Sequence, residues 1–277
     1  MIQLVAIDLD DTLLQSDLRI SHKNLEAIQA ARARGIIVGI ATGRVYDSVV
    51  KYADELGLFG TPGFIISAGG GHALETEGMQ TLHQQTLSGD LIDELLLFFN
   101  AHEVPVEVHH QGCSYATRDG RWVREDCRLA GLNLQVVDDL ETRIRDIPAY
   151  KLLIAEEQER IEQLFVETNI TFGERISTVI SKPQFLEVLP AGVNKGTALE
   201  RVAAHFSVGI DQCMAIGDGH NDLEMIRSVG CGVAVRNGNE ELKRIADYVT
   251  TGTNEESAVA EALEHLLSGD FLTPALA

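Results

Sequence analysis

The feature that most constrains the fold is a series of short apolar segments, each followed at once by polar or glycine-rich residues. The first three of these segments are residues 3–8, 36–41 and 64–67. Apolar runs without alternation are typical of strands buried on both faces of a parallel sheet. A helical pattern between the first two begins after Ser21, a good N-cap residue, and ends at Gly35. This alternation predicts an α/β fold with a doubly wound parallel sheet.

The strand–helix alternation breaks after the third segment and returns at Asn194. The intervening chain contains a helix followed by two alternating strands, and this pattern occurs twice, although residues 119–150 give no clear pattern. From Asn194 a helix and an apolar strand ending at Asp218 resume the α/β order. We therefore predict a core of residues 1–83 and 189–277 that is interrupted by an inserted α+β cap domain, residues 84–188. The tail from Phe271 is expected to be loosely held.

Charge limits the partners of this chain. The formal net charge is −20, which repels nucleic acid and anionic membranes, so we expect neither as a partner. An anionic substrate would need a site where a metal ion, a buried cation or helix N-termini reverse the field. The sequence shows no apolar run of membrane-spanning length and no signal-peptide pattern at its start, so we expect a cytoplasmic protein with reduced cysteines.

The polar residues at the ends of the first two segments suit phosphate chemistry. Asp8 and Asp10 stand two apart, so on an extended strand their side chains would point the same way. Two carboxylates that close need a cation, and Mg²⁺ prefers such oxygen ligands. Thr42, Gly43 and Arg44 follow the second segment and offer a hydroxyl, an accessible N–H and a guanidinium to an anionic oxygen.

A second acidic loop and a lysine complete the set. The loop runs from Gly217 to Asp222 and carries two carboxylates and the Asn221 amide, while Lys195 follows Asn194 at the start of a helix. Each element has an ordinary alternative, since turns favour Gly, Asn and Asp, and most lysines are solvated surface charges. Together, in this order and at strand ends, they indicate an active site more specifically than any one does alone.

These motifs resemble those of the haloacid dehalogenase (HAD) superfamily, and in detail its Cof-type subfamily, whose members insert an α/β cap (type IIB) after the third core strand. The matching segments are Asp8-Leu-Asp-Asp-Thr-Leu-Leu14, Ala41-Thr-Gly-Arg44, Gly192-Val-Asn-Lys-Gly-Thr-Ala198 and Asp218-Gly-His-Asn-Asp222. The resemblance covers nearly the whole chain, including the place of the insertion, and implies a Rossmann-like core. His220 falls at a position that the family leaves variable, and we assign it no role.

The resemblance implies a Mg²⁺-dependent phosphatase acting on small phosphorylated metabolites such as sugar phosphates. Asp8 would be the nucleophile and Asp10 the general acid and base. Mg²⁺ would be held by Asp8, Asp218 and the backbone carbonyl of Asp10, with Asp222 acting behind them. The residues expected to bind substrate or phosphate are Leu9, Thr42, Gly43, Arg44, Lys195 and Asn221. We expect a monomer or a weak homo-oligomer.

Two other functions remain open from the sequence. A sugar phosphomutase would use the same aspartates, and its products would distinguish it. A catalytically weak phosphometabolite-binding protein would show no turnover, although the full motif set argues against it. A P-type ion pump shares the chemistry but needs membrane spans, which this sequence lacks. The adjacent His109 and His110 face opposite sides of an expected strand and have no partner at metal-binding spacing, so we interpret them as ordinary histidines.

Overall fold

The computed structural model of the protein describes residues 1–269, so the expectation for the tail from Phe271 lies outside the described residues. The chain forms two compact units. We call them the core unit, which comprises residues 1–42, 51–83 and the chain from Asn194, and the insert unit, which comprises residues 43–50 and 84–193. Compared with the predicted domains, the insert unit extends five residues further, to Val193, and includes a short segment after Thr42.

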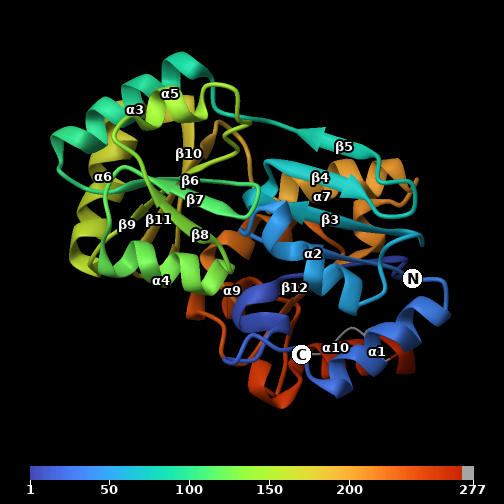
Figure 1. The fold of residues 1–277 in the computed structure, drawn as a ribbon. Coiled ribbons are helices and arrows are strands. Elements are labelled where there is room, and N and C mark those ends of the chain that lie inside the picture. Colours follow the sequence, from blue (N-terminus) through green and yellow to red (C-terminus); the bar gives the residue numbers. More distant parts are fainter. Residues whose placement is uncertain (270–277) are drawn as a thin grey trace. The chain divides into compact units, whose positions relative to one another are not determined.

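The core unit is built on an eight-stranded sheet in the order β14-β13-β12-β1-β2-β3-β4-β5 (Figure 1). All neighbours from β14 to β3 are parallel, and β4 pairs antiparallel with β3. The strands are β1 (Leu4–Ile7), β2 (Ile37–Ala41), β3 (Gly63–Ser67), β4 (His72–Glu75), β5 (Thr81–Gln84), β12 (Cys213–Gly217), β13 (Cys231–Ala234) and β14 (Tyr248–Val249). The predicted α/β class with a parallel sheet is confirmed.

Helices flank this sheet because its strands are apolar on both faces. The helices of the first and last parts of the chain are α1 (His22–Ala33), α2 (Tyr46–Glu55), α7 (Lys195–His205), α8 (Leu223–Ser228), α9 (Glu240–Ile245) and α10 (Ala258–Ser268). Apolar side chains of α7, α8 and α9 pack on one set of strand residues, while α1 and α10 pack against each other. The strands β1 to β3, β12 and β13 are almost completely buried, as their unbroken apolar sequences predict.

The strand order places a topological switch at the centre of this sheet. From β1 the chain passes to β2 on one side, and after the insertion it returns to β12 on the other side. Loops that follow two such strands diverge and leave a crevice at the carboxyl edge, which is where open α/β sheets bind ligands. Asp8 follows β1 and Asp218 follows β12, so the two predicted motifs meet at this crevice.

The insert unit has its own six-stranded sheet in the order β10-β11-β9-β6-β7-β8, antiparallel except for the β7–β8 pair. Its strands are β6 (Val106–His110), β7 (Cys113–Ala116), β8 (Asn133–Val136), β9 (Leu152–Ala155), β10 (Ile176–Lys182) and β11 (Phe185–Pro190). Its helices are α3 (Gly89–Ala101), α4 (Arg121–Ala130), α5 (Leu140–Ile144) and α6 (Gln158–Phe172). The stretch 119–150, which gives no clear pattern in sequence, therefore contains α4, β8 and α5.

The insert unit has a separate apolar core. One large cluster joins α3, α5 and α6 to one face of the sheet, and a smaller cluster under α4 includes Ala116, Val123 and Phe185. The unit is thus a sheet covered by helices rather than an extension of the first sheet. Within residues 1–269, no helix combines the length and the apolar character that crossing a membrane requires.

Candidate active site

The first motif forms a tight turn rather than an extension of β1. The Asp8 N–H donates to the Ile216 carbonyl of β12 at 3.0 Å, which is the last parallel step between these strands. Residues Leu9–Leu13 then form a turn that the Leu14 N–H closes by donating to the Leu9 carbonyl at 2.9 Å, and Asp11 in this turn has a φ of +58°. The strand that we predicted to Asp8 ends at Ile7, although the backbone angles of Asp8 and Asp10 are still extended.

Among residues 1–269, Lys195 is the cation that forms an ion pair with Asp8. Its side chain is fully buried, and Nζ lies 2.6 Å from Asp8 Oδ1 and 2.7 Å from Asp222 Oδ1. It occupies the first turn of α7, where the Asn194 side chain accepts a hydrogen bond from the Thr197 N–H at 2.8 Å. Lys195 is therefore an internal charge fixed by a capped helix, not a surface lysine.

Gly70 lets the start of α7 approach the sheet this closely. It has a φ of +107°, and a Cβ placed on it would lie 2.2 Å from the Asn194 carbonyl oxygen. Any side chain here would therefore push away the helix start that carries Lys195. The glycine run after β3, which the sequence marks only as a turn, thus has a positional role.

Asp222 shapes the second acidic loop. One of its oxygens accepts from the backbone N–H groups of Asp218 (3.1 Å) and Gly219 (3.0 Å), and the other accepts from Lys195. Asp218 itself accepts from the Thr12 hydroxyl at 2.9 Å, which joins this loop to the first motif. Asp222 therefore fixes the loop and the lysine together, whereas Asp218 lies only partly buried.

The cluster carries more negative charge than Lys195 balances. Desolvation raises the pKa of Asp8 to about 7 against the opposing effect of Lys195, with Asp222 and Asp10 adding to the rise. Desolvation, Asp8 and Asp222 likewise raise the pKa of Asp218 well above its usual value. Burial opposes the charge on Lys195, but Asp222 and Asp8 outweigh it and raise its pKa. A further cation would relieve this repulsion.

The donor set fits Mg²⁺. Carboxylate oxygens of Asp8, Asp218 and Asp222 lie within 4.8 Å of one another. Both oxygens of Asp222 already accept hydrogen bonds, so Asp8 and Asp218 are the better candidates for direct ligands. Hard oxygen donors of this kind suit Mg²⁺. The carboxylate of Asp10 is not part of this group, and the ligand predicted there was its backbone carbonyl.

The second motif divides between the two units. Thr42 is buried in the core unit, where its N–H donates to Ile66 O (2.9 Å) and its carbonyl accepts from Gly69 N–H (3.0 Å). Gly43 and Arg44 group with the insert unit, and Arg44 is buried. The backbone thus holds Thr42 at the carboxyl end of β2.

The remaining predicted residues lie in the same two loops. Leu9 is buried, Asp10 is partly buried, and Asn221 lies in the short helical turn before α8. His220 is more than half exposed and stands 3.5 Å from Glu241 on α9, in agreement with the absence of an assigned role. The structure thus brings Asp8, Lys195, Asp218 and Asp222 together, while the role of each predicted residue stays a prediction.

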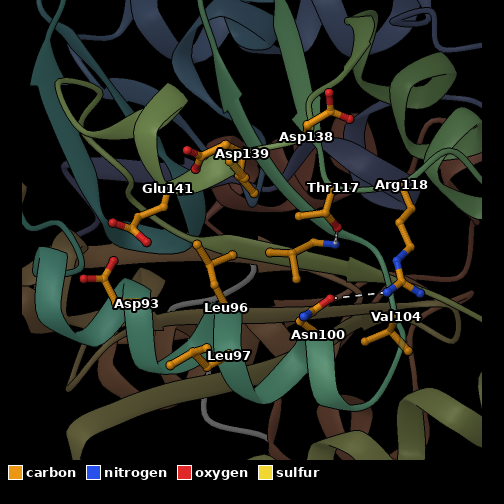
Figure 2. A pocket seen from close by; sticks show the side chains of 12 residues that line it. Asp93, Leu96, Leu97, Asn100, Val104, Thr117, Arg118, Asp138, Asp139 and Glu141 are labelled. Carbon is orange, nitrogen blue, oxygen red and sulfur yellow. Dashed lines mark hydrogen bonds between the residues drawn. The ribbon is translucent and has the colours of Figure 1, made fainter.

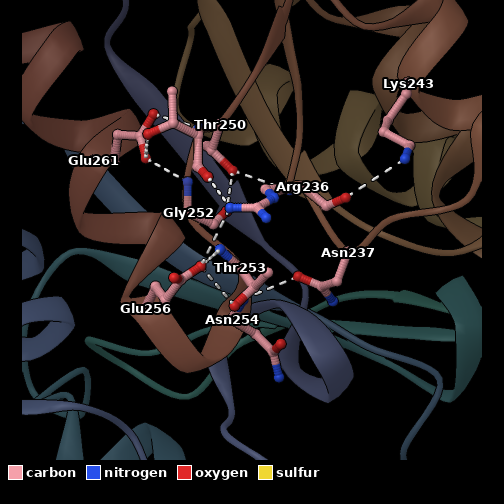
Figure 3. A network of polar contacts seen from close by, with 10 residues as sticks. Arg236, Asn237, Lys243, Thr250, Gly252, Thr253, Asn254, Glu256 and Glu261 are labelled. Carbon is pink, nitrogen blue, oxygen red and sulfur yellow. Dashed lines mark hydrogen bonds and ion pairs between the residues drawn. The ribbon is translucent and has the colours of Figure 1, made fainter.

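A polar network near the end of the core unit, which the motifs do not reveal, contains Asn237 and Asn254 (Figure 3). Asn237 donates to the Asp11 carbonyl at 2.7 Å, and Asn254 donates to the Leu14 carbonyl at 2.9 Å. The two asparagines are joined to each other, since the Asn254 N–H donates to Asn237 Oδ1 at 2.9 Å. Asn and Gly in the final loops were the only sequence signal, and it indicates turns rather than this contact.

Lys151 and Glu187 are charged residues of the insert unit that the sequence did not single out. Both are buried, and Lys151 Nζ lies 2.8 Å from Glu187 Oε1. The same ammonium donates to the Gly43 carbonyl at 2.8 Å. A buried lysine therefore fixes the backbone of the second motif from within the insert unit.

The insert unit also contains a pocket of about 350 Å³ beside α3 and α5 (Figure 2). Its charged lining comprises Asp93, Asp138, Asp139 and Glu141, against a single cation, Arg118. Such a lining repels phosphate, and no residue of the four motifs contributes to it. We therefore do not place the phosphate chemistry in this pocket.

A family model described as haloacid dehalogenase-like hydrolase matches residues 5–263. An HMP-PP phosphatase of Serratia proteamaculans is 32% identical over 99% of this chain and 98% of its own length. These matches span both units and all four motifs.

Solved structures agree with this match. A haloacid dehalogenase-like hydrolase from Bacteroides thetaiotaomicron superposes with a TM-score of 0.87 at 30% identity, covering 96% of this chain and all of the other. A haloacid dehalogenase-like hydrolase from B. subtilis gives a TM-score of 0.83 at 26% identity, with 96% and 100% covered. The similarity therefore includes the insert unit as well as the core unit.

Proposed function

The chain belongs to the haloacid dehalogenase-like hydrolase family, and from that premise we propose that it is a Mg²⁺-dependent phosphatase of small phosphomonoesters such as sugar phosphates. Membership bears out the resemblance drawn from the four motifs. The observation that carries the proposal is the buried contact of 2.6 Å between Lys195 Nζ and Asp8 Oδ1, beside Asp218. A carboxylate held next to a fixed ammonium and a metal-ligand partner is suited to attack an anionic phosphoryl group.

In the first step Asp8 attacks phosphorus and the bond from phosphorus to the leaving oxygen breaks. Asp10 gives its proton to that oxygen, so that an alcohol and an aspartyl phosphate result. Lys195 and the Thr42 hydroxyl hold phosphoryl oxygens, together with the Gly43 N–H and the Asn221 amide. Bound Mg²⁺ would neutralise charge on the phosphoryl group and on Asp8.

In the second step Asp10, now a carboxylate, takes a proton from water, and the water oxygen attacks phosphorus. The bond between phosphorus and Asp8 breaks, which releases inorganic phosphate and restores both aspartates. The net reaction consumes one ester and one water and yields one alcohol and one phosphate. Release of free phosphate, rather than transfer to a second sugar hydroxyl, separates this activity from a mutase.

We assign selection of the substrate to the insert unit, as a cap. Leu9 and Arg44 would add contacts to the substrate beyond the phosphoryl group. Closing of the cap would exclude water during the first step. Because the alcohol part of the substrate differs between metabolites and the phosphoryl part does not, residues outside the four motifs must make the choice. We retain a cytoplasmic location and a monomeric or weakly oligomeric state as parts of this proposal. The four free cysteines support the location, because the cytosol keeps thiols reduced.

The test is phosphate release from a panel of phosphorylated metabolites, with and without Mg²⁺. The panel includes sugar phosphates and HMP-PP, because the Serratia relative is named for the latter. We expect turnover that ends on exhaustive chelation and returns with Mg²⁺. Full activity after chelation, or sugar-to-sugar phosphate transfer without free phosphate, would contradict the proposal.

A further inference from the structure

A second cluster of charged side chains is buried within the insert unit. Glu107 and His109 stand two apart on β6, so both project from the same face of the sheet. Asp126 reaches them from α4. His109 Nε2 lies 2.9 Å from Asp126 Oδ2 and 3.8 Å from Glu107 Oε2, and one donor atom from each residue falls within a common 4.8 Å. The cluster shares no residue with the four motifs.

The donor atoms of the cluster are buried and lack ordinary hydrogen bonds. The three side chains are 0%, 4% and 10% exposed for Glu107, His109 and Asp126. Within the described residues, His109 Nε2, Asp126 Oδ2 and Glu107 Oε1 have no hydrogen bond of acceptable geometry, although the first two atoms are 2.9 Å apart. The Ser114 hydroxyl donates to the other Glu107 oxygen at 2.6 Å. Buried polar atoms are rarely left in this state without a partner of another kind.

The charges of the cluster are also unbalanced. Within residues 1–269, no lysine or arginine forms an ion pair with Glu107 or Asp126. Two carboxylates and a neutral imidazole carry a charge of −2, and a protonated imidazole would still leave −1. Buried charge without compensation is costly, so a cation or bound protons must be present.

We propose that Glu107, His109 and Asp126 form a second metal site, which binds a divalent transition-metal ion, Zn²⁺ by preference. The imidazole nitrogen favours such an ion over Mg²⁺, and a set of one histidine and two carboxylates matches the ligands that Zn²⁺ accepts. Ser114 acts behind the ligands by orienting the Glu107 carboxylate. The ion joins β6 to α4 and so fixes the helix over this face of the sheet.

The metal-free alternative is a proton-sharing triad. In that case burial raises the pKa of Glu107, and the two carboxylates raise the pKa of His109 to about 9 against the effect of burial. The two possibilities predict different results for Glu107→Gln. In a triad this change replaces a buried carboxyl group that must share a proton with a neutral amide, which stabilises the metal-free protein and leaves the Co²⁺ affinity unchanged. In a metal site it weakens metal binding.

The experiment titrates full-length, chelator-treated protein with Co²⁺, a spectroscopic substitute for Zn²⁺, in excess Mg²⁺. We expect the protein to bind one equivalent of Co²⁺ and to show the visible absorption bands of the bound ion. The Asp218→Asn variant, in which the core metal site is impaired, should bind Co²⁺ in the same way. His109→Gln and Asp126→Asn should weaken this binding by at least about 100-fold, since even residues behind the ligands cost 10- to 100-fold. His110→Gln is the matched control, because its partly exposed side chain alternates to the other face, and it should bind normally.

A second measurement does not depend on the folding of any insert-unit variant. Zn²⁺ added to metal-free Asp218→Asn should raise its Tm, because an ion that binds only the native state stabilises it. The proposal is overturned if Co²⁺ binding is the same in His109→Gln as in the unaltered chain, if Zn²⁺ leaves the Tm of Asp218→Asn unchanged, or if Glu107→Gln raises the Tm of the metal-free protein without affecting Co²⁺ affinity.

Discussion

The core unit and the insert unit each bury a cluster of carboxylates, but the negative charge of these carboxylates is compensated differently in the two units. In the core unit the carboxylates of Asp8 and Asp222 share the ammonium of Lys195, which lies in the first turn of α7. In the insert unit Glu107 and Asp126 have only the imidazole of His109. The first cluster lies in loops at strand ends, whereas the second lies on a strand face beneath a helix.

This difference suggests a division of roles. A cluster in loops at the carboxyl edge of a parallel sheet lies where such sheets bind ligands, and its Asp218 is only partly buried. The ammonium of Lys195 would serve there each phosphoryl group that the proposed reaction brings in. A cluster covered by α4 is closed on one side by packed secondary structure, which suits an ion that stays bound. The following variants test whether chemistry belongs to the first cluster alone.

The largest effect is expected from Asp8→Asn. The amide retains the size of the side chain but cannot form the aspartyl phosphate, so turnover should fall by at least about 10⁴-fold, as for loss of other nucleophiles. The measurement is the rate of phosphate release at saturating Mg²⁺. Asp11→Asn is the control, because Asn tolerates the same positive φ and the Asp11 side chain is exposed. Near-normal turnover of Asp8→Asn would exclude the covalent intermediate.

A somewhat smaller effect is expected from Asp10→Asn. This variant loses both proton transfers, each of which contributes roughly 10²–10⁴-fold, and we expect a loss near the upper end. With p-nitrophenyl phosphate the leaving group needs little protonation, so the first step should suffer less than the second. Rapid mixing should then show a burst of nitrophenol followed by slow turnover. Equal loss on this substrate and on a sugar phosphate, with no burst, would argue against both roles for Asp10.

The sequence predicted the core unit better than the insert unit for a physical reason. Strands such as β1 and β12 are buried on both faces, so their apolar composition alone identifies them as strands of a parallel sheet. In the stretch 119–150, β8 is a short strand at the sheet edge with mostly exposed residues, so it leaves no strong local signal. α4 begins at Arg121, and its N-cap residue, Gly120, has no side chain that could mark this start in the sequence.

The same reasoning separates what was predictable in the two clusters. Asp8, Lys195, Asp218 and Asp222 stand at strand ends and a helix start, where topology brings them together. Their contacts within the turn were not predictable, since they depend on the left-handed backbone of Asp11, which no residue type in the motif requires. His109 was visible in sequence, but its partnership with Asp126 depends on how α4 packs on the sheet, which no spacing rule describes.

An intermediate effect, confined to the insert unit, is expected from Ser114→Ala. Removal of the hydroxyl that orients Glu107 should weaken binding of the proposed Zn²⁺ by about 10- to 100-fold. The measurement is a competition between the protein and a chromophoric chelator. Phosphate release with Mg²⁺ should stay close to that of the unaltered chain when Zn²⁺ saturates the site. A parallel loss of turnover under these conditions would break the division of roles between the clusters.

The smallest effect is expected from Asn254→Ala in the polar network that contains Asn237 and Asn254 (Figure 3). The variant removes the donor to the buried Leu14 carbonyl, which should cost about 1–3 kcal/mol of unfolding free energy. Turnover should change only a few-fold, because Asp8 remains fixed by its backbone bond to β12. Asn237→Ala removes an exposed bond to Asp11 and a partly buried bond from the Asn254 N–H, and because water can reach both sites it should cost less. Denaturant unfolding and initial rates measured on both variants check this order. A loss of turnover after Asn254→Ala as large as that after Asp10→Asn would show that the position of the turn, and not its acid and base, limits catalysis in the core unit.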